Sequence, residues 1–198
     1  PLQPVFLSSA SSMPLVLRAP YIQYERVLLK LLPTSPFVLE LCAGMGENTS
    51  LLVAHSEHLV ASDISPHSLD VLQSRFSGSV NLETLVCDME ELPFPPDSFD
   101  LVVCAGGLSY SDNRVVMHQI LRVLKSGGHF VCVDSLNHNP IYVVNRFFHF
   151  LRGRRTFSTL LRMPSFSLIA LYRSSFANVT CYFFGAFSWL LLPLSFLL

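Results

Sequence analysis

The sequence predicts an α/β fold in which helices cover both faces of a mostly parallel sheet, and three observations support this prediction. From Phe37 onward, short runs of β-type residues alternate with segments of helical periodicity. The short runs are strongly apolar, which is typical of parallel strands that are buried on both faces. A glycine-containing turn connects the first run to a helical segment. With 198 residues, the chain can hold one such domain with a short appendage.

The individual elements follow from residue patterns. A helix at 21–32 precedes the sheet, because it has an amphipathic pattern. Ser65 and Pro66 are the residue types favoured at the N-cap and at the first position of a helix. Three prolines make 92–98 a loop. The predicted strands are 37–42, 58–62, 81–87, 99–105 and 128–134. The predicted helices between them are 47–55, 66–76 and 113–124, the last ended by the glycine pair at 127–128.

The composition excludes two broad classes of protein. Apolar residues make up 51% of the chain and charged residues only 14%, which excludes intrinsic disorder. A net charge of -1 argues against a dedicated nucleic-acid binder, whose balance is basic. The five cysteines lack the spacing of zinc ligands, so no metal is expected. They lie mostly in apolar runs, which suits a reducing cytoplasm, and the N-terminal stretch lacks the basic start of a signal peptide.

Charge is distributed unevenly along the chain. Residues 1–134 hold all 14 acidic side chains and seven basic ones, a net charge of −7, whereas residues 135–198 hold six arginines and no acid. This asymmetry suggests that the two parts meet different partners, although arginines that only keep an apolar tail soluble would give the same counts. Residues 174–198 carry no charge. We favour a covered strand plus helix there over interfacial membrane contact, and such contact over a membrane span.

The strongest motif is VLELCAGMGEN, residues 38–48. A strand that ends with the acid Glu40 runs into a turn with Gly44 and Gly46, and the turn opens a helix. Glycines allow backbone N–H groups to approach a ligand closely. A dinucleotide fingerprint would place a third glycine at Thr49, and Glu40 would lie near the pyrophosphate, so an acid here better suits a ligand with an ammonium group. A turn that needs glycine only for its geometry is the alternative.

Two further acids follow strands of the predicted sheet. Asp63 ends the second strand, at about the distance along the chain from the first motif that is expected of a carboxylate on ribose hydroxyls. Helix capping is the alternative for this side chain. Asp88 follows the third strand and is a candidate acceptor for an exocyclic amine, with Met89 beside it to pack on a base.

Together these motifs resemble those of the class I S-adenosylmethionine-dependent methyltransferases, especially their small-molecule, ubiquinone-biosynthesis-like branch. The resemblance covers about residues 37–134 and rests on E-x-C-x-G-x-G, the acid at 63, D-M-E-x-L-P-F-x-x-x-S-F-D and R-V-L-K-S-G-G. It implies a Rossmann-like fold and an enzyme that uses S-adenosylmethionine. Two positions depart from the family: Cys42 stands where the first glycine is usual, and Ser126 replaces the usual proline.

The resemblance also implies roles for individual residues. Glu40 is expected toward the methionyl amine, Gly44 and Gly46 beneath the methionyl and ribose moieties, Asp63 on the ribose hydroxyls, and the Asp88–Met89 pair at the adenine. The chain is accordingly divided into an N-terminal arm and helix (1–36), an S-adenosylmethionine-binding core (37–134), a basic helical cap on the acceptor side (135–176), and a sixth strand with an apolar, truncated tail (177–198).

The acceptor must be inferred from the segment after the fifth strand. Residues 137–173 resemble, more loosely, a segment of methyltransferases encoded with bacterial polysaccharide genes. This implies a small acceptor such as a sugar hydroxyl of a nucleotide- or lipid-linked saccharide, with arginines on its phosphates. Contact of the same arginines with anionic lipid headgroups is the alternative. His138 is the candidate general base, or else a loop histidine that bonds the backbone.

Three tyrosines and two other functions complete the predictions. Tyr21, Tyr24 and Tyr110 are candidates to attract a sulfonium cation, although packing is the more common role of each. An NAD-dependent oxidoreductase is disfavoured by Glu40 and Thr49. A degenerate or truncated relative that serves as a scaffold or a membrane-peripheral partner remains open, because Cys42 departs from the family and the chain is short for its class. We therefore expect a cytoplasmic protein with a small-molecule acceptor, no nucleic acid, and membrane contact through the C-terminal segment as an option.

Overall fold

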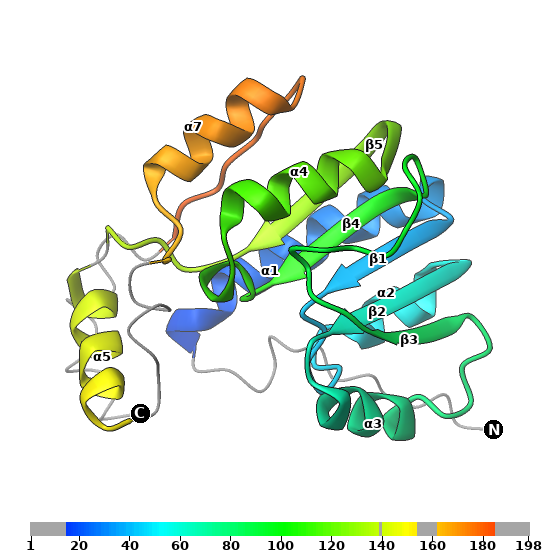
Figure 1. Cartoon of the computed structure of the whole chain (residues 1–198), viewed down its shortest axis with the longest axis horizontal. Coiled ribbons are helices and arrows are strands. Elements are labelled where there is room, and N and C mark those ends of the chain that lie inside the picture. Colours follow the sequence, from blue (N-terminus) through cyan, green and yellow to red (C-terminus); the bar gives the residue numbers. More distant parts are fainter. Residues whose placement is uncertain (1–14, 139, 154–161, 185–198) are drawn as a thin grey trace.

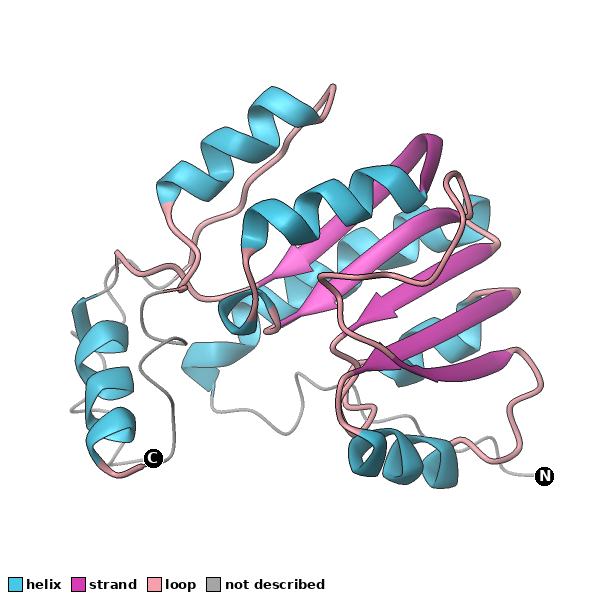
Figure 2. Ribbon diagram, viewed as in Figure 1, coloured by secondary structure: helices cyan, strands magenta, loops and turns pink. Residues whose placement is uncertain are grey.

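The computed structural model describes residues 15–138, 140–153 and 162–184. They contain a parallel sheet of five strands in the order β3-β2-β1-β4-β5, drawn in Figure 1 and Figure 2. The strands are β1 (Phe37–Leu41), β2 (His58–Asp63), β3 (Leu82–Val86), β4 (Phe99–Ala105) and β5 (Leu124–Val133). The α-helices are α1 (Leu15–Leu31), α2 (Thr49–His55), α3 (Pro66–Arg75), α4 (Asn113–Val123), α5 (Pro140–Leu151) and α7 (Phe166–Ser175). The predicted Rossmann-like α/β fold is confirmed.

Helices cover both faces of the sheet. Figure 1 shows α1 and α2 behind it and α4 in front. On the α1 side, Leu28 and Leu52 pack with Val38 and Val103 in one apolar cluster, and all four side chains are fully buried. Burial of an aliphatic side chain of this size stabilises the fold by about 1.5–3 kcal/mol. The apolar strands predicted from the sequence are therefore the centre of a three-layer arrangement.

The α4 side of the sheet carries a second cluster that reaches α7. Ile120 of α4 packs there on the strands, and Leu168 and Tyr172 join the cluster from α7. Phe130 of β5 contacts the Tyr172 ring edge-on, with 5.8 Å between the ring centroids. Helix α7 thus belongs to the packed body of the domain, although it lies beyond residue 134.

The start of α3 confirms a local prediction. The Ser65 hydroxyl accepts a hydrogen bond from the Ser68 N–H, and Pro66 occupies the first turn. Proline has no N–H, and the first position of a helix does not need one. The pair therefore starts the helix without the loss of a hydrogen bond. The polar end of β2 is therefore followed directly by a fixed helix, which positions the residues at 63–65.

The boundary between α4 and β5 differs from the prediction. The helix ends at Val123, and β5 already begins at the buried Leu124, which pairs with Phe99. The glycine pair lies inside the strand, at an irregularity in its pairing with β4. Gly127 has a φ of 79°, and a Cβ at Gly128 would lie 3.1 Å from the Asp100 carbonyl oxygen. These glycines therefore bend a strand and do not end the helix.

The predicted sixth strand at 177–184 is wrong. Among the described residues the sheet ends at β5, and 178–184 has no regular secondary structure. Side chains hold its beginning: Val179 packs on the α4-side cluster, and the Phe176 ring stacks on Phe130 at a centroid distance of 6.3 Å. A segment with the composition of a strand is therefore held here by apolar side-chain contacts and not by backbone pairing. Residues 185–198, the rest of the predicted tail, lie outside the described residues.

The N-terminal helix is longer than predicted. It already includes Leu15, the first described residue, and Pro20 lies within it. Because proline has no backbone N–H, Pro20 removes one i to i−4 hydrogen bond from the helix, which continues on both sides of it. Among the described residues, no helix is long and apolar enough to cross a membrane.

Candidate functional site

The carboxyl ends of the parallel strands bring two of the predicted acids to one edge. Asp63 ends β2, and its Oδ2 accepts a hydrogen bond of 2.9 Å from the Gly44 N–H, in the loop after β1. The other oxygen, Oδ1, accepts one from the Ser65 N–H, also at 2.9 Å. Asp63 is half-buried. It therefore fixes the glycine loop against β2 and still has lone pairs free for ligand hydroxyls.

Glu40 lies deeper at the same edge. Its side chain is 2% exposed, and its Oε2 accepts a hydrogen bond of 2.7 Å from the Thr49 hydroxyl. The pKa of Glu40 is raised to about 8, mainly by burial and to a smaller extent by the negative charges of Glu47 and Asp63, against the lowering effect of the Thr49 hydrogen bond. Without a cation beside it, Glu40 is therefore mostly protonated at neutral pH.

Two other buried polar atoms near this loop lack partners among the described residues. They are the hydroxyl of Tyr24, which is 5% exposed, and Oδ1 of Asn48 at the N-cap of α2. Burial, and after it the negative charge of Glu40, holds the pKa of Tyr24 well above its usual value. A buried acid such as Glu40, to which the described residues donate a single hydrogen bond, fits a ligand that carries an ammonium group.

The two glycines of the motif have different surroundings. Both have positive φ, 56° at Gly44 and 85° at Gly46. A Cβ at Gly46 would lie 2.9 Å from Cε2 of Phe76 and 3.0 Å from Cγ of Leu72, whereas at Gly44 the nearest atom would be the Glu47 carboxylate at 3.6 Å. Gly46 therefore lets α3 pack closely on the loop, and Gly44 leaves open space at the edge of the site.

The substitution Gly46→Ala is expected to destabilise the protein by about 2–3 kcal/mol, since it adds a steric clash to an unfavourable φ. Gly44→Ala is the matched control, because it has the same backbone problem without the clash, and we expect a loss of about 1 kcal/mol. Urea denaturation of both variants measures the difference. Equal losses would contradict the packing role of Gly46.

Cys42 adopts a conformation that suits a glycine. Its φ is 54°, in the left-handed region, where side chains are strained. Its Sγ lies 3.6 Å from the Met89 sulfur. The neighbouring loop compensates for the extra bulk with a glycine of its own, because a Cβ at Gly107 would lie only 2.6 Å from Cys42 Sγ and 2.9 Å from Cys104 Sγ. Cys42 thus fills the space that the missing side chain of Gly107 leaves open.

This packing predicts a rescue. Gly107→Ala is expected to cost about 2–3 kcal/mol of stability, because its new methyl group has no room beside the two sulfurs. Adding Cys42→Gly to the same chain removes two of the three close contacts and should restore at least half of the loss. A double-mutant cycle in urea measures the coupling. Additive effects of the two substitutions would show that the two positions do not compete for this space.

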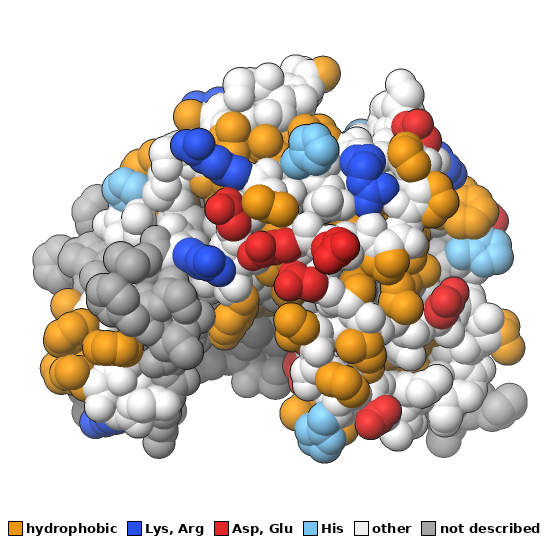
Figure 3. Space-filling view, viewed as in Figure 1, with side chains coloured by type: hydrophobic (Ala, Val, Ile, Leu, Met, Phe, Trp, Pro, Cys, Tyr) orange, Lys and Arg blue, Asp and Glu red, His pale blue; other side chains and the backbone are white. Residues whose placement is uncertain are grey.

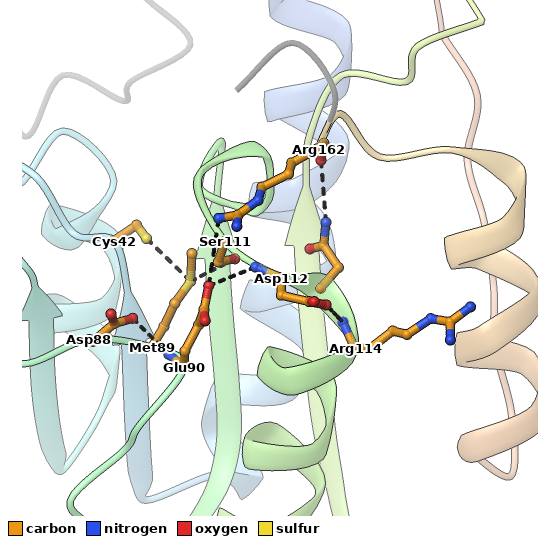
Figure 4. Close-up of polar contacts among 9 residues, drawn as sticks. Cys42, Asp88, Met89, Glu90, Ser111, Asp112, Arg114 and Arg162 are labelled. Carbon is orange, nitrogen blue, oxygen red and sulfur yellow. Dashed lines mark hydrogen bonds and ion pairs between the residues drawn. The ribbon is translucent and has the colours of Figure 1, made fainter. Parts of the chain in front are cut away.

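The loop after β3 holds the predicted adenine residues apart from each other (Figure 4). Asp88 is exposed, and its Oδ1 accepts a hydrogen bond from the Glu90 N–H at 2.9 Å. Met89 is buried in the core under this loop, with only 7% of its surface exposed. Asp88 therefore faces solvent while Met89 faces Cys42, and the assignment of the pair to an adenine stays a prediction.

Glu90 connects this loop to α4 and to the segment before α7. Its Oε1 accepts a hydrogen bond of 2.7 Å from the Asp112 N–H and lies 3.9 Å from Nη1 of Arg162 (Figure 4). Asn113 Nδ2 in turn contacts the Arg162 carbonyl oxygen at 3.4 Å. These partners of Glu90 lie more than twenty and seventy residues away along the chain, so no local sequence pattern indicates them.

A groove of about 730 Å³ opens beside these contacts, between the N-terminal turn of α4 and α7. Its walls include the cations Arg114 and Arg162, several serine hydroxyls and apolar side chains of α7. Figure 3 shows the acidic and basic side chains that gather on this face of the molecule. The groove was missed by sequence reasoning, since it forms only when α7 packs on α4.

The candidate base lies at the start of α5. His138 is exposed, and its ring centroid is 4.1 Å from that of Phe166 in α7. Among the described residues, the hydrogen-bond partners of Glu40 and Asp63 are Thr49, Gly44 and Ser65, and not His138. Its role as a base stays a prediction. Of the three tyrosines, only Tyr24 is buried at the site, and Tyr110 is 56% exposed.

A further acid at the same edge was not singled out from the sequence. Asp134 directly follows β5, and its Oδ2 accepts a hydrogen bond of 2.9 Å from the Leu108 N–H, in the loop after β4. Its position after an apolar strand is the signal that also marks Asp63 and Asp88. Asp134 therefore fixes the β4–α4 loop as Asp63 fixes the glycine loop.

Comparison with known proteins shows what this core is similar to. A methyltransferase domain family matches residues 38–128. A demethylmenaquinone methyltransferase of Clavibacter sepedonicus is 36% identical over 110 residues, which cover 55% of this chain and 44% of that protein. The ubiquinone/menaquinone biosynthesis C-methyltransferase UbiE of Stenotrophomonas maltophilia is 37% identical over 98 residues, 46% of this chain and 39% of that protein. The chain thus spans less than half the length of these two relatives.

Solved structures agree on the fold. The YcgJ protein of Bacillus subtilis superposes with a TM-score of 0.63 at 22% identity, covering 78% of this chain and 68% of that one. A sarcosine dimethylglycine methyltransferase from Galdieria sulphuraria gives a TM-score of 0.62 at 18% identity, covering 78% of this chain and 61% of that one. At such identities the likeness concerns the fold alone.

Proposed function

The core of this chain, residues 38–128, belongs to the class I S-adenosylmethionine-dependent methyltransferases of the ubiquinone-biosynthesis-like branch, and from this premise we propose that the protein transfers a methyl group from S-adenosylmethionine to a small acceptor. The observation that carries the proposal is the location of two acids, Glu40 and Asp63, at the same edge of the sheet. Glu40 is buried with a single hydrogen bond, and Asp63 holds the glycine loop at Gly44.

The residues at this edge fit the cofactor's functional groups. Glu40 would accept hydrogen bonds from the methionyl ammonium, with Gly44 leaving room for the chain, and Asp63 would accept from the ribose hydroxyls. Asp88, which is exposed, would accept from the adenine amine. S-adenosylmethionine brings a methyl group on a sulfonium, which is already activated toward nucleophiles. The protein's main task is then to position the acceptor.

For the acceptor we propose a sugar hydroxyl of a phosphate-bearing saccharide, either nucleotide- or lipid-linked. The groove beside α4 supports this, because Arg114 and Arg162 line it together with serine hydroxyls. Among the described residues that line it, the single acid is Asp112, whose Oδ1 accepts a hydrogen bond from the Arg114 N–H. Arginine is well suited to phosphate oxygens. An imidazole nitrogen of His138 would accept the proton of the hydroxyl. The relatives named for demethylmenaquinone suggest a quinone as the second class of acceptor.

Inorganic pyrophosphate tests the groove without knowledge of the acceptor. We expect the double variant Arg114→Gln/Arg162→Gln to lose at least about tenfold in pyrophosphate affinity, as befits two charge-assisted contacts. The matched control is Arg173→Gln, an exposed arginine on α7 that does not line the groove. Unchanged binding in the double variant would remove the groove from the acceptor proposal.

Calorimetry with S-adenosylmethionine and S-adenosylhomocysteine tests the cofactor. Binding of both, with no binding of NAD, supports the methyltransferase and excludes the oxidoreductase alternative. If neither sulfur compound binds, the protein is better described as a degenerate relative with a scaffold role. We propose a cytoplasmic location, which is compatible with peripheral contact to a membrane surface, and fractionation of cell extracts tests it.

A further inference from the structure

Helix α5 carries a stripe of apolar side chains that face solvent. The stripe consists of Val144, Phe147, Phe148 and Leu151, whose exposed fractions are 53%, 47%, 53% and 61%. These positions follow the spacing i, i+3, i+4 and i+7, so they share one face of the helix. Figure 3 shows apolar side chains gathered at the lower left, where Figure 1 places α5.

A second group of exposed aromatic side chains lies at the start of α5. Phe166 is 51% exposed and Phe183 is 58% exposed, and their ring centroids are 6.1 Å apart. Phe166 also contacts the ring of His138, two residues before the helix begins. Several large apolar side chains from three segments are thus exposed in the same part of the molecule, which is unusual for a surface that meets only water.

The positive charge of this part of the chain indicates which kind of partner the surface can bind. All six charged side chains of residues 135–198 are arginines, among them Arg146 within α5 and Arg152, Arg154 and Arg155 directly after it. A second copy of this segment would bring positive charge against positive charge. Anionic headgroups above an apolar layer would satisfy the arginines and the stripe together.

We propose that α5 is a membrane-binding helix, whose apolar stripe inserts at the interface of a bilayer that bears anionic headgroups. Its 12 residues are too few to cross a bilayer, so the helix lies in the plane of the surface. The exposed Arg152, directly after the helix, contacts the headgroups. This binding does not depend on the methyltransferase activity, and it goes beyond that function.

Vesicle sedimentation with the full chain tests this surface. The wild-type protein is expected to sediment with vesicles of phosphatidylcholine and phosphatidylglycerol, and to bind pure phosphatidylcholine more weakly by about tenfold or more. The variant Phe148→Glu/Leu151→Glu should lose at least about tenfold of its binding to the anionic vesicles. The matched control is Val115→Glu, an apolar residue of α4 that is 40% exposed and lies outside the stripe.

S-adenosylhomocysteine binding or the circular dichroism spectrum shows that each variant is folded. The proposal is overturned if the folded stripe variant sediments like the wild type, or if the wild type binds neither kind of vesicle. Loss of sedimentation in Val115→Glu to the same extent would also overturn it, since the stripe would then have no special part. These outcomes differ from failure of the methyltransferase proposal, which concerns cofactor binding alone.

A fluorescent probe distinguishes a bilayer from other occupants of the stripe. Trp189 is the single tryptophan of the chain, so Trp189→Phe/Phe148→Trp places one indole in the stripe. We expect its emission to shift to shorter wavelength only when anionic vesicles are added. Emission that is already blue-shifted without vesicles would show that other residues of the chain cover the stripe. A shift that depends on protein concentration would identify a second copy, and either result would overturn the proposal.

Discussion

Replacing Asp63 by alanine is expected to weaken the binding of S-adenosylhomocysteine by about a hundredfold or more. The carboxylate holds the Gly44 N–H at 2.9 Å and is the predicted acceptor for two ribose hydroxyls. A hydrogen bond to a charged group is worth about 1.5–3 kcal/mol, so the loss of two to the ribose, with a loosened loop, gives an effect of this size. Calorimetric titration of the folded variant measures it.

Two further variants separate the ribose contact from the loop contact. Asp63→Asn keeps one acceptor oxygen and should lose less than alanine does, while Asp70→Ala, an exposed acid on α3, should bind as the wild type. Adenosine, which has the ribose but no methionyl group, should show the same relative loss with Asp63→Ala. If binding in Asp63→Ala is undiminished, Asp63 does not hold the ribose.

The parts of the site that the sequence predicted are those set by strand order and local chemistry. Glu40 and Asp63 lie at the same edge because parallel strands place their carboxyl ends together, and adjacent strands β1 and β2 carry them. The cap at Ser65 needed only its own neighbours along the chain. Such features depend on contacts that are short in sequence or fixed by the sheet.

The features that could not be predicted depend on contacts between distant segments. Cys42 tolerates a positive φ beside Gly107, sixty-five residues later, and no local pattern connects the two. The groove needs α7 to pack on α4, and 178–184 has a strand-like composition but is anchored by side chains. Tertiary packing overrides local propensity at each of these places.

The buried Glu40 predicts an unusual dependence of stability on pH. Its pKa of about 8 in the folded protein lies above the value of 4.5 that an ordinary glutamate has, so between these values the folded state binds more protons than the unfolded state. The free energy of unfolding therefore falls as the pH rises from about 4.5 to about 8, and this loss is complete above pH 8. Glu40→Gln removes the titrating group and should be more stable than the wild type at alkaline pH, by up to about 5 kcal/mol.

Ligand binding should reverse this preference. A methionyl ammonium beside Glu40 favours the charged carboxylate, so binding of S-adenosylhomocysteine at neutral pH must release the proton of Glu40. We expect its affinity to rise with pH up to about 8, and the calorimetric enthalpy to depend on the buffer as for the release of about one proton. Glu40→Gln should bind at least about tenfold more weakly at pH 8 and show neither dependence, because a neutral amide replaces the carboxylate.

Thr49→Val is the control for the surroundings of this carboxyl group. The Thr49 hydrogen bond lowers the pKa of Glu40, so its loss raises that pKa. The rise in affinity should therefore shift to higher pH without being abolished. Substitutions at His138, which is exposed and is not the hydrogen-bond partner of Glu40 among the described residues, should leave the pH dependence of binding unchanged. A wild-type enthalpy that is the same in all buffers would mean that Glu40 is already ionised in the free protein, or that it does not meet the amine. The stability of Glu40→Gln decides between these two explanations. The wild type is the less stable protein at high pH only if Glu40 is protonated in the free protein at neutral pH.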